Sequence, residues 1–286
     1  MVDIGIGIPN SVRGTTGPQL VEWARRADTA GFSSLATIGR VAYPNYEELT
    51  VLAAAGAVTD RIRLLTDILL APTRSTAELA KQAATVQELS GGRLGIGLGV
   101  GGREDDFLLT GWDFRHRGRA FDQQLTDLRR AFAGEPLLEG GWPVVPAPVT
   151  VPILIGGTSD AAVRRTVEYG IGWTAGGAPP QMVGPFVERV RAAWRDAGRE
   201  GSPRIVALNY FGLGDTEDQS RANLLDYYRI LGPETAEMIA SSAHRSPEAV
   251  RAVIAAFEEV GVDELILDPS VSDPAQVDLL AEVALP

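Results

Sequence analysis

The stretch IRLLTDILLAPTRSTAELAKQAATVQELSGGRLGIGLGV, residues 62–100, decides the fold. Its first part, Ile62–Leu70, is apolar at nearly every position, which is typical of a strand buried on both faces in a parallel sheet. Residues 73–89 then carry apolar side chains at helical spacing, and Arg93–Val100 is apolar again. Strand, helix and strand in this order predict a parallel βαβ unit.

The same alternation continues in both directions along the chain. The expected strands are Asp3–Pro9, Ser33–Ile38, Ile62–Leu70, Arg93–Val100, Val151–Gly156, Ile171–Ala175, Arg204–Leu213 and Asp263–Asp268. The expected helices cover residues 18–30, 46–59, 73–89, 115–133, 159–170, 180–198, 216–242 (broken at Gly232-Pro233), 246–260 and 274–284. Eight strands, each followed by helix, predict a single α/β domain over residues 1–286, a closed (β/α)8 TIM barrel, with a loop insertion at 134–150 that has room for a short hairpin.

The composition excludes several classes of protein and site. Hydrophobic residues make up 45% of the 286 residues, enough for a large core, and a net charge of −11 argues against a broad basic surface for nucleic acid or membrane lipid. With no cysteine and two histidines, thiolate nucleophiles, iron–sulfur clusters and multi-histidine metal centres are excluded. No apolar run is long enough to span a bilayer and the first residues lack signal-peptide features, so we expect a cytoplasmic protein.

A possible phosphate site follows the fifth expected strand, where the chain reads Gly156-Gly157-Thr158-Ser159-Asp160 and opens a helix. In a TIM barrel the site lies at the carboxyl ends of the strands. Glycines let backbone N–H groups approach an anion, and the helix start adds free N–H groups and a favourable dipole. The alternative is that Ser159 only caps the helix and the glycines only make a turn.

The fourth strand carries glycines at Gly97, Gly99 and Gly102 that match G-x-G-x-x-G. We reject a Rossmann dinucleotide site, because the motif runs through the strand itself and helix follows where an acidic ribose ligand should lie. Two interpretations remain. The glycines leave one strand face bare for a flat ring, or the barrel interior needs small residues for packing.

Asp67 is an acidic residue inside the apolar third strand, which is costly unless the carboxyl is bonded or lies at the mouth of the barrel. It either bonds a neighbouring backbone amide or belongs to a bulge that contacts a cofactor. The two histidines belong to no HExxH motif and no GxSxG elbow is present, which argues against a Ser–His–Asp hydrolase. We expect His116 to begin a helix and His244 to be exposed.

Several segments together resemble the bacterial luciferase-like flavin-dependent oxidoreductases. They are IGIGIPN, RIRLLTDILLAP, SGGRLGIGLGVGGREDDF with the following RGRAFDQQL, VPILIGGTSDAAVRR, GWTAGG and SPEAV…GVDELIL, in order over nearly the whole chain. The resemblance implies a TIM barrel that binds reduced FMN or the deazaflavin coenzyme F-420 and forms a homodimer. It also implies a small-molecule substrate and, with FMN, a separate flavin reductase as partner.

The resemblance also assigns residues. Gly156, Gly157, Thr158 and Ser159 would hold the cofactor phosphate, Thr66 and the Asp67–Ile68 bond would lie against the ring, and Gly99 and Gly101 would line its pocket. In this family the bond at 67–68 is often a non-proline cis peptide in a bulge. The chain departs from the family in two places: Gly39-Arg40 stands where an acidic–histidine pair is often found, and Gly102 replaces a bulkier residue, which would open the pocket.

Without cysteine, metal cluster or triad, a cofactor must supply the redox chemistry. Reduced FMN would let the protein oxygenate its substrate, whereas F-420 would exchange hydride. Arg40 is the candidate for binding an anionic substrate or a ring oxygen, and Tyr43 or Tyr210 for relaying a proton, although a tyrosine would need a lowered pKa to act as a base. Two alternatives remain: an aldolase or isomerase of phosphorylated substrates, with a lysine or carboxylate base inside the barrel, and a non-catalytic flavin-binding protein.

Overall fold

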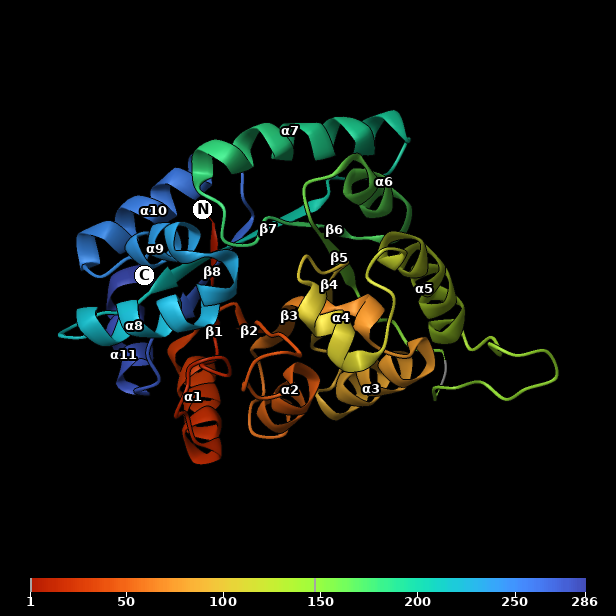
Figure 1. Cartoon of the computed structure of the whole chain (residues 1–286), viewed down its shortest axis with the longest axis horizontal. Coiled ribbons are helices and arrows are strands. Elements are labelled where there is room, and N and C mark those ends of the chain that lie inside the picture. Colours follow the sequence, from red (N-terminus) through yellow and green to blue (C-terminus); the bar gives the residue numbers. More distant parts are fainter. Residues whose placement is uncertain (1, 147) are drawn as a thin grey trace.

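In a computed structural model of the chain, which describes residues 2–146 and 148–286, eight parallel strands close into one barrel (Figure 1). The strands are β1 (Asp3–Gly7), β2 (Ser34–Thr37), β3 (Arg63–Leu70), β4 (Leu94–Gly99), β5 (Ile153–Gly156), β6 (Gly172–Thr174), β7 (Arg204–Phe211) and β8 (Glu264–Pro269). Each strand pairs with its neighbour in sequence, and β8 pairs with β1, where Ile4 lies opposite Leu265. The expected (β/α)8 barrel is confirmed.

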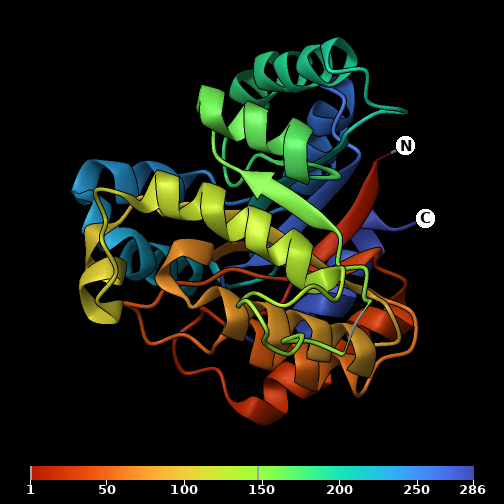
Figure 2. The ribbon, with the colours of Figure 1, turned by 90° about the vertical axis from the view of Figure 1, so that its right-hand side faces the viewer.

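Helices cover the outside of the barrel (Figures 1 and 2). They are α1 (Gly17–Ala30), α2 (Glu48–Gly56), α3 (Thr76–Leu89), α4 (Glu104–Thr110), α5 (Arg117–Phe132), α6 (Asp160–Tyr169), α7 (Pro180–Asp196), α8 (Glu217–Tyr228), α9 (Pro233–Ser241), α10 (Pro247–Glu259) and α11 (Ala275–Ala284), with short 3₁₀ helices η1 (Ala71–Thr73) and η2 (Arg229–Leu231). None of the helices in the described part of the chain combines the length and the apolar character needed to cross a membrane.

The apolar side chains form two layers. Outward-facing strand residues pack against the helices, around fully buried rings such as Trp23, Phe121 and Phe257. A second cluster, which includes Leu65, Leu154, Val206, Leu208 and Ile266, fills the inside of the barrel. Because side chains alternate along a strand, Glu264, Ile266 and Asp268 of β8 face this interior in succession from the floor to the mouth. The barrel is therefore a packed core, and ligands reach it only from its ends.

The structure differs from the sequence-based expectation in three segments. The short helix α4 was not expected, because its seven residues begin with three acids and are too few to show apolar side chains at helical spacing. The expected helix at 73–89 is divided into η1 and α3, and that at 216–242 into α8, η2 and α9 with a break at Gly232. No hairpin forms in the described residues of 134–150, a segment that contains Ala147, which lies outside them.

Candidate active site

A cavity of about 200 Å³ opens at the carboxyl-terminal mouth of the barrel. Of the residues expected at the site, it is lined by Arg40, Asp67, Ile68 and Tyr210. The rest of its wall comes from Ile38, Gly39, Leu70, Gly102, Arg103, Asp106, Gly176, Gly177, Leu208, Tyr227 and Tyr228. The cavity thus joins β2, β3 and β7 with the segments after β4 and β6 and the end of α8.

The peptide bond between Asp67 and Ile68 is cis, as the family resemblance implies. The pairing of β3 with β4 shifts register between Thr66 and Leu69, so the bond lies in a bulge. Thr66 itself is fully buried and donates a hydrogen bond to the carbonyl of Gly97 at 2.9 Å. It fixes the start of the bulge and does not line the cavity.

The Asp67 carboxyl group is buried and has one hydrogen-bond partner. Its Oδ1 accepts from the hydroxyl of Thr174 at 2.6 Å, and its Oδ2 has no partner. The expected bond to a neighbouring backbone amide is absent. Burial raises the pKa of Asp67 to about 7, and burial together with the nearby Asp67 raises the pKa of Asp268 well above its ordinary value. The mouth therefore holds a carboxyl group that exchanges a proton near neutral pH.

The side chain of Ile68 covers the glycine track that the sequence places on β4. A Cβ on Gly99 would overlap Ile68 Cδ1, and one on Gly156 of β5 would lie 2.8 Å from the same atom. Gly99 therefore leaves room for Ile68, as the packing interpretation holds, and neither Gly99 nor Gly101 lines the cavity. The bare backbone on the cavity wall comes from Gly39, Gly102, Gly176 and Gly177. Of these, only Gly102 was connected with the pocket from the sequence.

The turn from Gly156 to Ser159 lies at the same end of the barrel, with Gly156 buried at the end of β5 and Gly157, Thr158 and Ser159 open to solvent. Gly157 has φ +103°, which favours glycine, and its carbonyl accepts a hydrogen bond from the Trp173 indole at 2.8 Å. The Ser159 hydroxyl accepts from Ala162 N at 3.2 Å and caps α6, as the alternative interpretation expects. Thr158 is exposed, and none of these residues lines the cavity. A phosphate at this turn stays a prediction.

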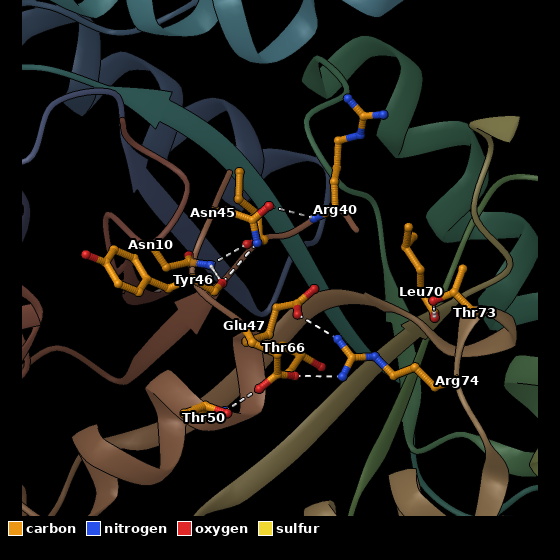
Figure 3. A network of polar contacts seen from close by, with 12 residues as sticks. Asn10, Arg40, Asn45, Tyr46, Glu47, Thr50, Thr66, Leu70, Thr73 and Arg74 are labelled. Carbon is orange, nitrogen blue, oxygen red and sulfur yellow. Dashed lines mark hydrogen bonds and ion pairs between the residues drawn. The ribbon is translucent and has the colours of Figure 1, made fainter. Parts of the chain in front are cut away.

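Arg40 is held by two carboxylates. Its side chain is 5% exposed, with Nη2 2.5 Å from Asp105 Oδ2 and Nε 3.5 Å from Asp106 Oδ2. Asp106 is fully buried, and its other oxygen accepts from the backbone N–H of Ala42 at 2.7 Å. Figure 3 shows the Arg40 guanidinium extending away from Asn45, which contacts only its backbone N. The charge of Arg40 is therefore balanced within the protein.

The candidate tyrosines do not have the lowered pKa that a base requires. Tyr43 donates a hydrogen bond to Asp226 Oδ2 at 2.8 Å, and burial with this contact raises its pKa. Burial also raises the pKa of Tyr210, whose hydroxyl lies 2.5 Å from that of Tyr228. Tyr210 lines the cavity, whereas Tyr43 packs edge-on behind Tyr227. Both remain protonated at neutral pH, so either one can donate but neither can act as a base.

Arg103 is a site residue that sequence reasoning missed. Its guanidinium lies over the rings of Tyr227 and Tyr228, at 5.5 and 5.4 Å from their centroids. Its Nη1 is buried and has no hydrogen-bond partner. The available signal was its position directly after β4, where a barrel places functional residues. The tyrosines that hold it come from α8, far along the chain.

The expectation that His244 is exposed is wrong. Its ring is half-buried, because the segment around it runs beside β7, and Nε2 lies 3.1 Å from Asn209 Oδ1. Burial lowers its pKa, and it does not line the cavity. His116 immediately precedes α5 as expected, is exposed, and lies 2.5 Å from Asp113. Neither histidine is part of the candidate site.

Residues 3–282 match the family model described as luciferase-like monooxygenase. The chain is a member of the luciferase-like monooxygenase family. It is 30% identical over 251 residues to an uncharacterized Mycobacterium tuberculosis protein, Rv0940c, covering 74% of this chain and 86% of that one.

Solved structures of the luciferase-like fold agree with this assignment. Monooxygenase RslO1 from Streptomyces bottropensis superposes with a TM-score of 0.81 at 23% identity, over 100% of this chain and 99% of the other. An F-420-dependent secondary alcohol dehydrogenase, solved with an F-420–acetone adduct, gives 0.79 at 18% identity, over 99% and 98% of the two chains. Structural relatives thus include enzymes that bind FMN and enzymes that use F-420.

The structure gives a reason for the glycine at position 39 of this luciferase-like chain. A Cβ on Gly39 would overlap the carboxylate of Glu48, so a larger residue does not fit at that position. Glu48 is buried and paired with Arg74 at 2.8 Å, and Arg74 also binds Glu47 at 2.7 Å (Figure 3). This ion-pair network fixes the start of α2 and leaves Ile38 and Arg40 as the side chains that follow β2 and line the cavity.

Proposed function

We propose that this chain is an oxidoreductase that uses reduced FMN or coenzyme F-420 to transform a small to medium organic metabolite. One observation carries the proposal: the cavity beside the cis Asp67–Ile68 bond, at the mouth of a luciferase-like barrel, combines apolar walls with a titratable carboxyl group and two arginines. A redox ring needs an apolar, partly enclosed place beside the groups that move protons and hold charge.

The residues present fit such a cofactor. Backbone at Gly39, Gly102, Gly176 and Gly177 and the apolar side chains of Ile38, Leu70 and Leu208 offer flat surfaces to a ring. The open turn from Gly156 to Ser159 is the nearby place for a phosphate, because the N-terminus of α6 and the exposed hydroxyl of Thr158 are directed to solvent there. The bound cofactor supplies hydride, or with FMN the capacity to use oxygen.

The chain's own residues would handle charge and protons. Asp67, with a pKa of about 7, gives or takes a proton at its unbonded Oδ2. Tyr210 donates a hydrogen bond or proton from its hydroxyl, and Arg40, whose charge Asp105 and Asp106 balance, forms part of the polar wall beside it. Tyr43 positions Tyr227 from behind.

Fluorescence titration of the purified protein with FMN and with F-420 tests this function. We expect saturable binding of one of them, and weaker binding after Gly157→Val, which adds a side chain to the open turn at a positive φ. Thr29→Val on the outside of α1 is a matched control with an exposed, remote position. The proposal fails when neither cofactor binds.

One observation favours the second candidate, a cofactor-independent isomerase or aldolase of phosphorylated substrates. Asp67 is a carboxyl base inside the barrel, as that function requires, whereas the only lysine, Lys81, is exposed on α3 and excluded from Schiff-base chemistry at the mouth. Cofactor-free exchange of substrate hydrogen with D₂O would favour this candidate. Binding of a cofactor without turnover under reducing conditions would favour a non-catalytic flavin-binding protein.

Two partners are part of the proposal. We infer a homodimer from the family resemblance, which light scattering during size-exclusion chromatography tests. With FMN as cofactor, a separate reductase would supply the reduced form, so turnover should depend on an added flavin reductase. With F-420 the reduced cofactor is enough.

A further inference from the structure

We propose that Arg103 forms an anion subsite in the mouth cavity and binds a carboxylate or phosphate group of the ligand that occupies it. The subsite deepens the proposed function, on which it rests for the identity of the reacting ligand. The anionic group comes either from the substrate or from the cofactor, and the chemistry of recognition is the same for both.

Arg103 differs from the other arginines of low exposure because its guanidinium has neither a carboxylate partner nor a hydrogen bond within the described part of the chain. Arg93 and Arg199 also lack an ion pair, but they donate to the backbone carbonyls of Ile62 and Gly170 at 2.9 and 3.1 Å. Arg40 binds Asp105, Arg74 binds Glu47 and Glu48, and Arg165 binds Asp122 at 2.8 Å. Among the residues that the structure describes, Arg103 forms no ion pair and its Nη1 is buried without a hydrogen bond. Arg103 is half-buried, and a partly desolvated guanidinium without a partner is costly, so a site that retains one is suited to receive its partner from a ligand.

The acids next to Arg103 do not neutralise it. Asp105 and Asp106 point to Arg40, and Glu104 is exposed. Asp67 and Asp268, the other acids at the mouth, have raised pKa values and are less charged than ordinary carboxylates. Arg103 is therefore a cation at the wall of the cavity that no described carboxylate pairs with, in a chain of net charge −11.

Two tyrosines hold the guanidinium in a fixed place. Cation–π contacts with the Tyr227 and Tyr228 rings orient it at the wall of the cavity, and no hydrogen bond within the described part of the chain uses its side-chain N–H groups. Ile38, Leu70 and Leu208 supply the apolar part of the same cavity. This combination suits an organic acid with an apolar body better than a free inorganic ion.

Two pairs of probes separate the possible sources of the anion, measured by isothermal titration calorimetry. Benzoate and benzamide have the same ring and differ in charge, and FMN and riboflavin differ in the phosphate. We expect wild-type protein to prefer the anionic member of at least one pair about tenfold or more. Arg103→Met should abolish that preference, Arg103→Lys should keep part of it, and Arg25→Met on the exposed side of α1 should leave it unchanged.

Each outcome decides. Loss of the benzoate preference alone assigns the subsite to substrate, and loss of the FMN preference alone assigns it to the cofactor phosphate. Wild-type protein without a preference in either pair, or Arg103→Met with an undiminished preference, overturns the subsite. A wild-type protein that binds neither FMN nor F-420 but prefers benzoate through Arg103 refutes the proposed function and keeps the subsite. Thermal unfolding checks that the variants fold. If Arg103→Met does not fold, the preference of wild-type protein within the two probe pairs still tests the subsite.

Discussion

At the scale of single residues, position 67 shows how burial changes the chemistry of a side chain. An exposed aspartate is ionised at neutral pH, whereas the pKa of Asp67 is raised to about 7 by burial inside the barrel. Thr174 stabilises the ionised form through one hydrogen bond but does not offset the desolvation. The pKa of this carboxyl group near neutral pH is therefore a consequence of its location.

The raised pKa of Asp67 predicts a pH-dependent stability. Between about pH 4 and pH 7 the folded state keeps a proton that the unfolded state has lost, so the free energy of unfolding falls as pH rises through this range. Asp67→Asn removes this term, and the variant should gain stability relative to wild type as pH rises from about 5 to 8. Asp268 shifts in the same direction, so the variant keeps part of the dependence.

Urea unfolding at several pH values measures the difference between Asp67→Asn and wild type. Asp196→Asn, at the exposed end of α7, serves as the matched control and should differ from wild type by a constant amount. A constant difference for Asp67→Asn as well would contradict the prediction. The pKa values of His244 and Glu264 are both lowered, so each of these residues makes the free energy of unfolding rise with pH, opposite to Asp67. This contribution is common to wild type and both variants.

Two glycines with open space around them predict different effects of the same substitution. Gly31 ends α1 with φ +107°, so Gly31→Ala should lower the free energy of unfolding by about 1–2 kcal/mol. Gly17, the first residue of α1, has no positive φ and no atom within 4 Å of an added Cβ, so Gly17→Ala should be neutral or stabilising. Denaturant unfolding of both variants checks the contrast. Equal effects would mean that backbone conformation is not the cause.

At the scale of elements, β3 and β4 are coupled through Ile68 and Gly99. Gly99→Ala forces Ile68 aside and should cost about 1–3 kcal/mol, while Ile68→Ala removes half-buried methyl groups that cover Gly99 and Gly156 and should cost about 2 kcal/mol. The double variant should lose about 1 kcal/mol less unfolding free energy than the sum of the two single losses, because Ile68→Ala makes room for the methyl group added by Gly99→Ala. Unfolding free energies of the four proteins give the coupling.

Gly102 provides the control for this cycle. An added Cβ there meets no atom within 4 Å, so Gly102→Ala combined with Ile68→Ala should be additive. Coupling of the same size at both glycines would contradict the packing explanation.

The positions of strands follow from their apolar runs, and for that reason all eight were predicted within a few residues. Helix α4 was not, because its seven residues are stabilised by contacts of Asp106 with the β2 loop and of Phe107 with Gly101 and Phe114. The site was predicted in part: Arg40, Asp67, Ile68 and Tyr210 line the cavity. Arg103 was missed, because its importance depends on α8 rings that only the folded chain brings to it.

At the scale of the whole molecule, the two ends of the chain meet where the barrel closes. β8 pairs with β1, α11 packs on α1, and Figure 2 shows both termini on the same side. At the floor below them, buried Glu264 accepts hydrogen bonds from Ser34 at 2.7 Å and Arg204 at 2.6 Å. The contacts of β8 with β1 and of α11 with α1, here called the seam, therefore stabilise the closed barrel as a whole.

Adjacent leucines in α11 test the seam. Leu280 is 0% exposed and Leu279 is 37% exposed. We expect Leu280→Ala to lower the free energy of unfolding by about 2–5 kcal/mol and Leu279→Ala by about 0.5 kcal/mol. Because the ring closes at this point, the loss should appear as one earlier cooperative transition in thermal unfolding followed by circular dichroism. A separate early transition for Leu280→Ala would show that α11 unfolds independently.

Ile68 reaches across two strands at positions where no side chain opposes it. A change in the length of this one side chain alters the free space over both strands without altering their hydrogen bonds to each other. A single substitution at Ile68 can thus change the shape of the cavity while the outer core that supports the barrel stays intact. Natural divergence and directed evolution can therefore change the range of ligands at this position with little loss of stability.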